Sequence, residues 1–218
     1  MPLSQAAPAY TTGRKDYPDF SIEDQHQGII CGLDEVGRGP LAGPVVAACV
    51  IILKEKRTLP FINHIRDSKK LGHKKLFMLY DEITSNFPHA IAEISPAEID
   101  QINILQASLK AMSIAAEKTG HIDHALVDGN KAPKLPCPVT TVVKGDAKSV
   151  SIAAASIIAK VHRDRIMTKL ALDHPYYGWE NNVGYPSPQH LKAVKQHGIT
   201  PHHRRSFAPV RQYIESNQ

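Results

Sequence analysis

The chain reads GIICGLDEVGRGPLAGPVVAACVIIL over residues 28–53, and this stretch decides the fold class. It opens with a short apolar run over 28–33 and closes with a longer run over 45–53 that is rich in β-branched residues. Both runs are typical of buried strands. The segment 37–44 between them carries glycines and prolines that forbid a helix. We therefore predict two strands that are joined by a turn and pair antiparallel.

The rest of the chain alternates between helical and strand patterns. Helices are predicted over 74–86, from 102 to near Gly120, over 149–170, and from 188 to near Gly198 with Ser187 as the N-cap. The buried face of the second helix is predicted to carry Ile102, Leu105, Leu109, Met112 and Ala116. Further strands are predicted over 90–94, 124–127 and 139–143. This order indicates one α/β domain with a mixed sheet and a helical C-terminal part.

Charge and cysteine content narrow the class of protein. The 218 residues include 26 Lys and Arg against 21 Asp and Glu, a net charge of +5 that favours anionic partners such as nucleic acid. The three cysteines are odd in number and form no C-x-x-C, which argues against a disulfide framework and a structural zinc site. No apolar stretch is long enough to span a bilayer, and residues 1–27 lack the apolar run of a signal peptide. We expect a soluble cytoplasmic protein with no membrane partner, and a flexible N-terminal segment over 1–27.

Acidic residues stand at the ends of three predicted strands. Asp34 and Glu35 follow the first strand, Asp128 follows the strand over 124–127, and Asp146 follows the strand over 139–143. If these strands are neighbours, their carboxyl ends bring the four acids into one crevice. Four carboxylates there could not all stay ionised without cations. Mg²⁺ or Mn²⁺ prefers oxygen ligands, and a pair of such ions roughly 3.5–4 Å apart can hydrolyse a phosphodiester.

Each acid also has a purely structural interpretation. Asp34 and Glu35 could begin a turn, Asp128 with Gly129 could form the corner of a hairpin, and Asp146 could cap the long helix. An acid beside a buried strand nevertheless needs a partner. Neither the strand before Asp34 nor the strand before Asp128 contains Arg or Lys. The loop over 37–42 also matches a relaxed dinucleotide-binding fingerprint. That interpretation fails because the loop leads into a strand instead of opening a helix.

Several motifs together resemble a known family, bacterial ribonuclease HII. They are DEVGRGPLAG (34–43), DSKKL (67–71), DGN (128–130), VKGD (143–146), AAASI (153–157), AKV (159–161), GYP (184–186) and HHRRSF (202–207). The resemblance runs from about residue 28 to 210 in the family's order. It implies a ribonuclease H-like domain over 28–210, with a mixed five-stranded sheet flanked by helices and a helical C-terminal region. Residues 211–218 are then a C-terminal tail.

The resemblance also implies an activity. The family consists of metal-dependent endonucleases that cleave the RNA strand of RNA/DNA hybrids and incise duplex DNA at single embedded ribonucleotides, leaving 5′-phosphate and 3′-hydroxyl ends. Its metal-binding and catalytic carboxylates fall on Asp34, Glu35, Asp128 and Asp146, with Mn²⁺ or Mg²⁺ as the cofactor. Gly37, Arg38 and Gly39 correspond to the loop that recognises the ribose 2′-hydroxyl. Glycine amides can reach that group without an intervening side chain.

Other residues are assigned to substrate binding by the same resemblance. Tyr185 matches the tyrosine that stacks on the sugar of the following deoxyribonucleotide. Lys69, Lys70, Arg204 and Arg205 are expected to contact phosphates, which position a duplex without reading its sequence. The chain is expected to act as a monomer. Two alternatives remain open: a non-catalytic module that binds hybrids, and a nuclease of another specificity on the same fold.

Overall fold

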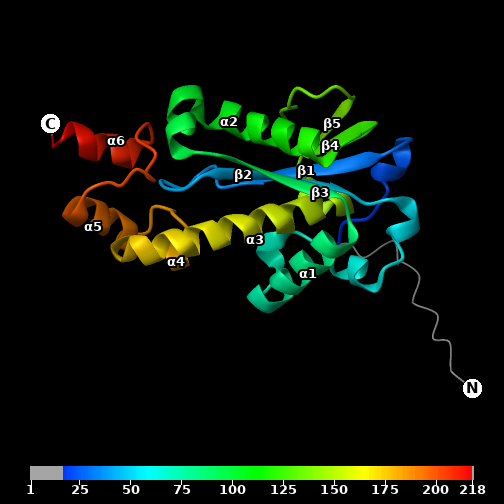
Figure 1. The fold of residues 1–218 in the computed structure, drawn as a ribbon, viewed down its shortest axis with the longest axis horizontal. Coiled ribbons are helices and arrows are strands. Elements are labelled where there is room, and N and C mark those ends of the chain that lie inside the picture. Colours follow the sequence, from blue (N-terminus) through cyan, green and yellow to red (C-terminus); the bar gives the residue numbers. More distant parts are fainter. Residues whose placement is uncertain (1–16, 218) are drawn as a thin grey trace, which may run out of the picture.

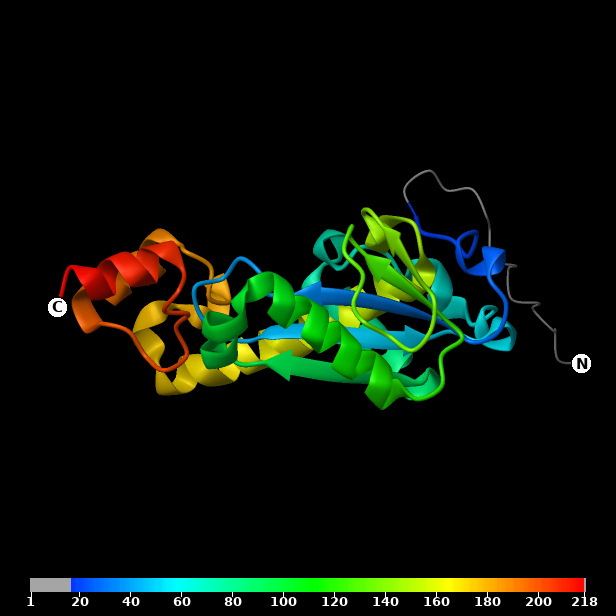
Figure 2. The same ribbon diagram turned by 90° about the horizontal axis from the view of Figure 1, so that it is seen from above.

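The computed structural model describes residues 17–217 as an elongated molecule with a central sheet and, at one end, a helical extension over residues 175–217 (Figures 1 and 2). The strands are β1 (Ile30–Val36), β2 (Val45–Ile51), β3 (His89–Ile94), β4 (His124–Asp128) and β5 (Val139–Val142). The α-helices are α1 (His73–Asn86), α2 (Pro96–Thr119), α3 (Val150–Asp173), α4 (Trp179–Asn182), α5 (Pro188–His197) and α6 (Ala208–Glu215). Short 3₁₀ helices are η1 (Glu23–Gln25), η2 (Lys54–Lys56), η3 (Pro60–His64), η4 (Ser68–Lys70), η5 (Gly145–Ala147) and η6 (Pro175–Tyr177).

The sheet has five strands in the order β3-β2-β1-β4-β5, which confirms the predicted mixed five-stranded sheet. The pair β1–β2 is antiparallel, as the turn-rich loop between these two strands predicts, and the pair β2–β3 is antiparallel as well. The pairs β1–β4 and β4–β5 are parallel. Because β1 is central and β4 lies beside it in parallel, the carboxyl ends of these two strands meet at one edge.

Alternating side chains of the strands form a core on each face of the sheet. Val46, Ala48 and Val50 of β2 pack with α1 and α3 on one face. The intervening residues of β2 pack with α2 on the other face, so the sheet lies between two helical layers (Figure 1). The helix α3 approaches β1 so closely that a Cβ at Gly32 would lie 2.1 Å from the Ser151 carbonyl carbon. The small residues of α3 permit this approach.

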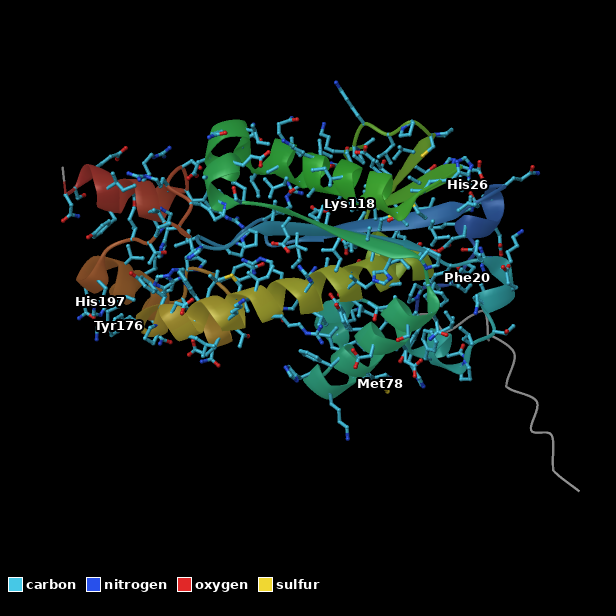
Figure 3. All side chains as sticks on the ribbon, viewed as in Figure 1. Phe20, His26, Met78, Lys118, Tyr176 and His197 are labelled. Carbon is cyan, nitrogen blue, oxygen red and sulfur yellow. The ribbon has the colours of Figure 1, made fainter. Side chains whose placement is uncertain are left out.

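The predicted flexible segment over 1–27 is contradicted for residues 17–27, which pack on the domain. Residues 1–16 lie outside the described residues. Phe20 is buried, and Glu23 is 1% exposed and accepts hydrogen bonds from Ser149 Oγ (2.8 Å) and Ser151 N (3.0 Å) at the start of α3. Figure 3 shows Phe20 and His26 at the opposite end of the molecule from the helical extension. The boundary at 27 was wrong because the partners of Glu23 are more than 120 residues away along the chain.

Two further boundaries differ from prediction. The helix α6 crosses the expected start of the tail at 211, with Val210 fully buried. The helix α2 begins at Pro96 and is kinked at Asn103, whose φ is 65°. The Asn103 side chain accepts from the backbone amides of Leu105 and Gln106 and so caps the second part of the helix. After the kink, the buried face is centred on Ala107, Ala111, Met112 and Ala115, so Leu105 and Leu109 lie at its border and are only half-buried. Among residues 17–217, none of the helices is both long and apolar enough to cross a membrane.

Candidate active site

The four acids come from three segments that the parallel strands bring to one edge of the sheet. Asp34 and Glu35 are part of β1 and so lie within the strand, not after it. Asp128 is the last residue of β4, and Asp146 lies in η5, directly after β5. We call these four residues the acidic edge. The hairpin interpretation of Asp128 is wrong, because the strand that follows it pairs in parallel with β4.

Burial and mutual repulsion raise the pKa values of three of these carboxyl groups. Asp34 is 5% exposed, and its pKa lies well above the usual range because it is buried and because Glu35, Asp128 and Asp146 are close. The pKa of Glu35 is raised by burial and by Asp128, although Arg38 opposes the shift. The charge of Arg38 therefore does not offset burial and repulsion within the acidic edge.

The pKa of Asp146 is raised mainly by burial and next by Asp67, and Asp128 adds to the shift while Lys69 opposes it. Asp67 is a fifth carboxylate that the sequence interpretation missed, although it opens the DSKKL motif. Its side chain accepts from Lys69 N at 2.9 Å and so caps η4. Lys69 lies near enough to Asp146 to oppose the rise of its pKa, and both Lys69 and Lys70 are exposed.

The carboxylates of the acidic edge are held by the protein itself. Asp34 Oδ1 accepts from Glu35 N at 2.7 Å, and Asp128 Oδ1 accepts from Gly145 N at 2.6 Å. Arg38 Nη1 donates to Glu35 Oε1 at 3.2 Å, but Glu35 Oε2 is buried without a hydrogen-bond partner. Across residues 17–217, no three carboxylate, imidazole or thiol groups surround one common metal position. The unpartnered oxygen and the raised pKa values nevertheless fit a divalent cation with a preference for oxygen ligands.

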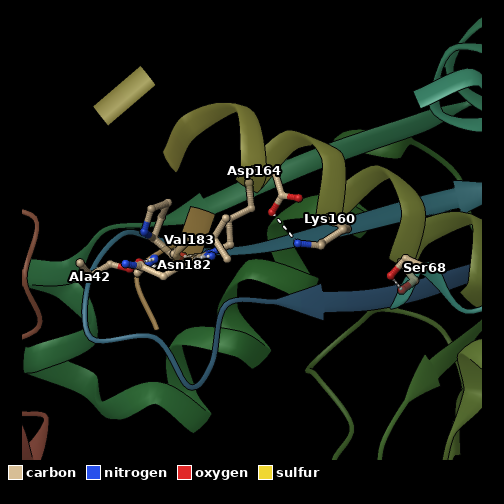
Figure 4. A network of polar contacts seen from close by, with 10 residues as sticks. Ala42, Ser68, Lys160, Asp164, Asn182 and Val183 are labelled. Carbon is tan, nitrogen blue, oxygen red and sulfur yellow. Dashed lines mark hydrogen bonds and ion pairs between the residues drawn. The ribbon is translucent and has the colours of Figure 1, made fainter. Parts of the chain in front are cut away.

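A hydroxyl chain supports Asp34 from α3. Ser156 Oγ lies 2.9 Å from Ser68 Oγ, and a hydrogen bond from Ser156 lowers the pKa of Asp34 against the effect of burial. Figure 4 shows Ser68 near α3, with the ion pair of Lys160 and Asp164 farther along the helix. Sequence reasoning missed Ser156, because serine in an alanine-rich helix gives no signal of its contacts.

The segment 37–44, which we call the glycine loop, is held from beneath by two buried arginines. Arg163 of α3 donates to the carbonyl oxygens of Pro44 (2.9 Å), Ala42 (3.0 Å) and Val183 (2.8 Å). Figure 4 shows Ala42 and Val183 side by side at this point. At Gly37, where φ is 91°, a Cβ would lie 2.2 Å from Arg163 Nε, so only glycine fits.

Arg204 corrects one expectation of the sequence. It is completely buried, and its guanidinium donates only to backbone carbonyls of the glycine loop, so it offers no group to a phosphate. Burial and the neighbouring Arg163 lower the pKa of Arg204 to about 9. Arg205 is exposed, and its backbone N donates to Asp100 at 2.9 Å. The two adjacent arginines therefore differ completely in environment.

Tyr185 lies beside the glycine loop, as the assigned roles require. Its side chain is exposed, and a Cβ at Gly39 would lie 3.3 Å from Tyr185 Cε1. The Tyr185 carbonyl pairs with His190 Nδ1 at 2.9 Å, which ties this residue to the helical extension. A pocket of about 200 Å³ is lined by Glu35, Arg38, Asp128 and the half-buried leucines of α2. Two residues of the acidic edge thus share a pocket with Arg38 of the glycine loop, and Tyr185 lies beside Gly39 of the same loop.

Comparison with known proteins decides the family. The family model described as Ribonuclease HII matches residues 31–210. The chain belongs to the ribonuclease HII family. This match covers the acidic edge, the glycine loop, Tyr185 and Arg204, and it confirms the resemblance seen in the motifs.

Relatives in sequence and structure agree with the family. Ribonuclease HII of Paramagnetospirillum magneticum is 52% identical over 198 residues, which cover 90% of this chain and 98% of the relative. The crystal structure of ribonuclease H2 from Pyrococcus horikoshii OT3 superposes with a TM-score of 0.73 at 28% identity, covering 87% of this chain and 98% of that one. A Bst-RNase HIII structure in complex with Mn²⁺ shares the fold, with a TM-score of 0.71 at 17% identity over 95% of this chain and 77% of that one. The chain is therefore an enzyme, a ribonuclease H that hydrolyses phosphodiester bonds.

Proposed function

We propose that this ribonuclease HII incises duplex DNA on the 5′ side of single embedded ribonucleotides, besides cleaving the RNA strand of RNA/DNA hybrids. The products are 5′-phosphate and 3′-hydroxyl ends. The observation that carries the proposal is the acidic edge, where burial and mutual repulsion raise carboxyl pKa values and Glu35 Oε2 has no partner. Such a site is incomplete until cations occupy it.

Asp34, Glu35, Asp128 and Asp146 are the residues that would hold Mn²⁺ or Mg²⁺. Bound there, a pair of such ions would supply an activated water and stabilise the leaving oxygen in an in-line displacement. Arg38 and the Gly145 amide already bind Glu35 Oε1 and Asp128 Oδ1, so the second oxygen of each of these carboxylates is the one available to a cation.

The remaining groups select and orient the substrate. Gly37, Arg38 and Gly39 read the ribose 2′-hydroxyl, which alone distinguishes RNA from DNA at one nucleotide. Tyr185, exposed beside Gly39, stacks on the sugar of the next deoxyribonucleotide. Lys69, Lys70 and Arg205 bind phosphates and hold the duplex in register. We further propose that the enzyme acts as a monomer in the cytoplasm, where its three free cysteines remain reduced.

A duplex with one ribonucleotide tests the proposal. With Mg²⁺ or Mn²⁺ we expect one incision on the 5′ side of the ribonucleotide, and none when EDTA is present or when the duplex is all DNA. Gel mapping of the product ends checks the position. Cleavage in EDTA, or equal cleavage of the all-DNA duplex, would refute it.

The variant Asp128→Asn distinguishes an enzyme from a module that only binds hybrids. We expect it to lose turnover on the order of a thousandfold while it keeps its affinity for hybrids, because Asp128 would hold a metal ion that acts on the reacting phosphate. Binding is measured by fluorescence anisotropy. A wild type that binds hybrids but shows no turnover would support the non-catalytic alternative.

A further inference from the structure

Arg204 is bonded to the glycine loop in a way that determines which loop groups face solvent. Its Nη2 donates to Gly37 O (2.6 Å) and Gly43 O (2.9 Å), its Nη1 to Arg38 O (3.0 Å), and its Nε to Gly43 O (3.0 Å). The Arg204 backbone N also donates to Leu41 O at 2.8 Å. One buried guanidinium therefore gathers three carbonyls of a loop that lies more than 150 residues earlier in the chain.

The orientation of these carbonyls fixes the orientation of the amides. In a trans peptide the C=O and the following N–H point in opposite directions. Since Gly37 O and Arg38 O point inward to Arg204, the N–H groups of Arg38 and Gly39 point outward. Both residues are exposed, whereas Gly37 is buried. Within residues 17–217, neither amide donates to an internal acceptor.

We propose that Arg204 is a positioning residue for ribonucleotide selection: it turns the Arg38 and Gly39 amides toward the substrate, where they bond the 2′-hydroxyl. This inference rests on the proposed function of the glycine loop. Arg204 itself touches no substrate, because its side chain is completely buried. It differs in this from Arg205, whose exposed side chain is free to meet a phosphate.

A forked donor is needed at this position. Four hydrogen bonds from three nitrogens hold carbonyls that face different directions, and only the planar guanidinium offers this arrangement. Lysine would keep the charge but would bond one or two of the carbonyls. The released peptide units could then rotate, and the amides would lose their common direction.

Binding measurements on a cleavage-deficient Asp128→Asn background test the proposal. Affinity is compared for two duplexes that are identical except that one has a single ribonucleotide and the other is all DNA. We expect Arg204→Lys to weaken binding of the ribonucleotide duplex by about fivefold, the effect of losing one hydrogen bond, while affinity for the all-DNA duplex stays unchanged. The matched control, Arg205→Ala, should weaken binding of both duplexes by the same factor.

The possible outcomes are distinct. If Arg204→Lys weakens both duplexes equally, or neither, the positioning role is overturned. If the Asp128→Asn reference itself binds the two duplexes equally, the proposed recognition of single ribonucleotides fails, and this inference fails with it. A reference with a clear preference that Arg204→Lys leaves intact overturns the inference alone.

A second measurement covers the case in which Arg204→Lys does not fold. On the Asp128→Asn protein, the amide resonances of Arg38 and Gly39 are followed by NMR during titration with each duplex. We expect both resonances to shift with the ribonucleotide duplex beyond their shift with the all-DNA duplex. Equal shifts with the two duplexes would overturn the inference.

Discussion

Two regions of this molecule bury ionisable groups, and they treat those groups differently. At the acidic edge, Asp34 and Glu35 are buried beside other acids, and Glu35 Oε2 has no hydrogen-bond partner. In the helical extension, Arg204 is completely buried, yet its guanidinium makes four hydrogen bonds to carbonyls. Burial disfavours the charged form in both regions, but only in the second are the polar atoms of the side chain satisfied by hydrogen bonds within the protein.

The buried ring nitrogens of His190 and His203 in the helical extension likewise all have hydrogen-bond partners. Trp179 Nε1 donates to His190 Nε2 at 3.1 Å, which leaves the His190 proton on Nδ1 to bond Tyr185 O. His203 Nδ1 accepts from Thr200 N at 3.0 Å, so its Nε2 carries a proton toward His190. Both rings are therefore neutral, and burial together with the neighbouring histidines lowers the pKa of His203 to about 3. The acidic edge leaves a buried carboxylate oxygen unpartnered, whereas the helical extension satisfies its buried arginine and histidine nitrogens internally. This contrast indicates that the acidic edge binds a ligand and that the extension is rigid.

The largest expected effect comes from Asp34→Asn at the acidic edge. Turnover should fall on the order of a thousandfold, because a carboxylate that would hold the metal is lost. The metal-free variant should also be more stable than the wild type, with a Tm higher by about 2–6 °C, since a buried charge and its repulsion disappear. Calorimetry and a cleavage assay check the two effects. The control Asp81→Asn, at an exposed position of α1, should change neither, and a lower Tm for Asp34→Asn would contradict the comparison.

A substitution in the helical extension should lower stability while it leaves turnover nearly unchanged, which is the opposite of the effect of Asp34→Asn. His190→Ala leaves the donors of Trp179 and His203 and the carbonyl of Tyr185 without their partner, and it opens a cavity. We expect a loss of about 3 kcal/mol in the free energy of unfolding, while turnover of a uniform RNA/DNA hybrid at 25 °C changes less than about tenfold. Urea denaturation measures the loss. The neighbouring exposed substitution Gln189→Ala serves as the control and should cost less than about 0.5 kcal/mol.

The smallest expected effect is a pH dependence that the two regions contribute with opposite sign. Because the pKa of Asp34 is raised, its carboxyl group binds a proton more tightly in the folded state than in the unfolded state. The free energy of unfolding therefore falls as pH rises from the pKa of the unfolded state toward the raised pKa of the folded state. His203 acts oppositely, because its lowered pKa adds stability as pH rises from about 3 to about 6.5. The wild type alone would show only the sum of the two contributions.

Comparison with Asp34→Asn isolates the acidic contribution. The stability advantage of the variant, measured in EDTA, should be small near pH 4 and grow toward pH 7. Adding Mg²⁺ or Mn²⁺ at pH 7 should stabilise the wild type more than the variant and so reduce or reverse the advantage. An advantage that does not change between pH 4 and 7 would show that Asp34 does not titrate as its surroundings require.

Local sequence patterns predicted much of the fold and the acidic edge. The apolar runs of 28–33 and 45–53 placed two antiparallel strands, and Ser187 with Gly198 marked both ends of α5. Such signals are local, because capping and strand alternation depend on residues a few positions apart. The acids were recognised because they follow buried strands without basic partners nearby. Whether these acids are the catalytic residues stays a prediction that the Asp34 and Asp128 variants test.

The family, the order of the strands along the chain and the candidate acids could be inferred from the printed residues alone. Three contacts became visible only in the folded chain: Glu23 accepts hydrogen bonds at the start of α3, Asp67 lies near Asp146, and Arg204 is a buried donor to loop carbonyls instead of a phosphate ligand. Sequence patterns relate residues a few positions apart, whereas these contacts join segments that are distant in the chain. Each of these side chains is polar, so sequence patterns predict it to lie at the surface. Folding brings it next to partners from distant segments, which replace the water that it loses.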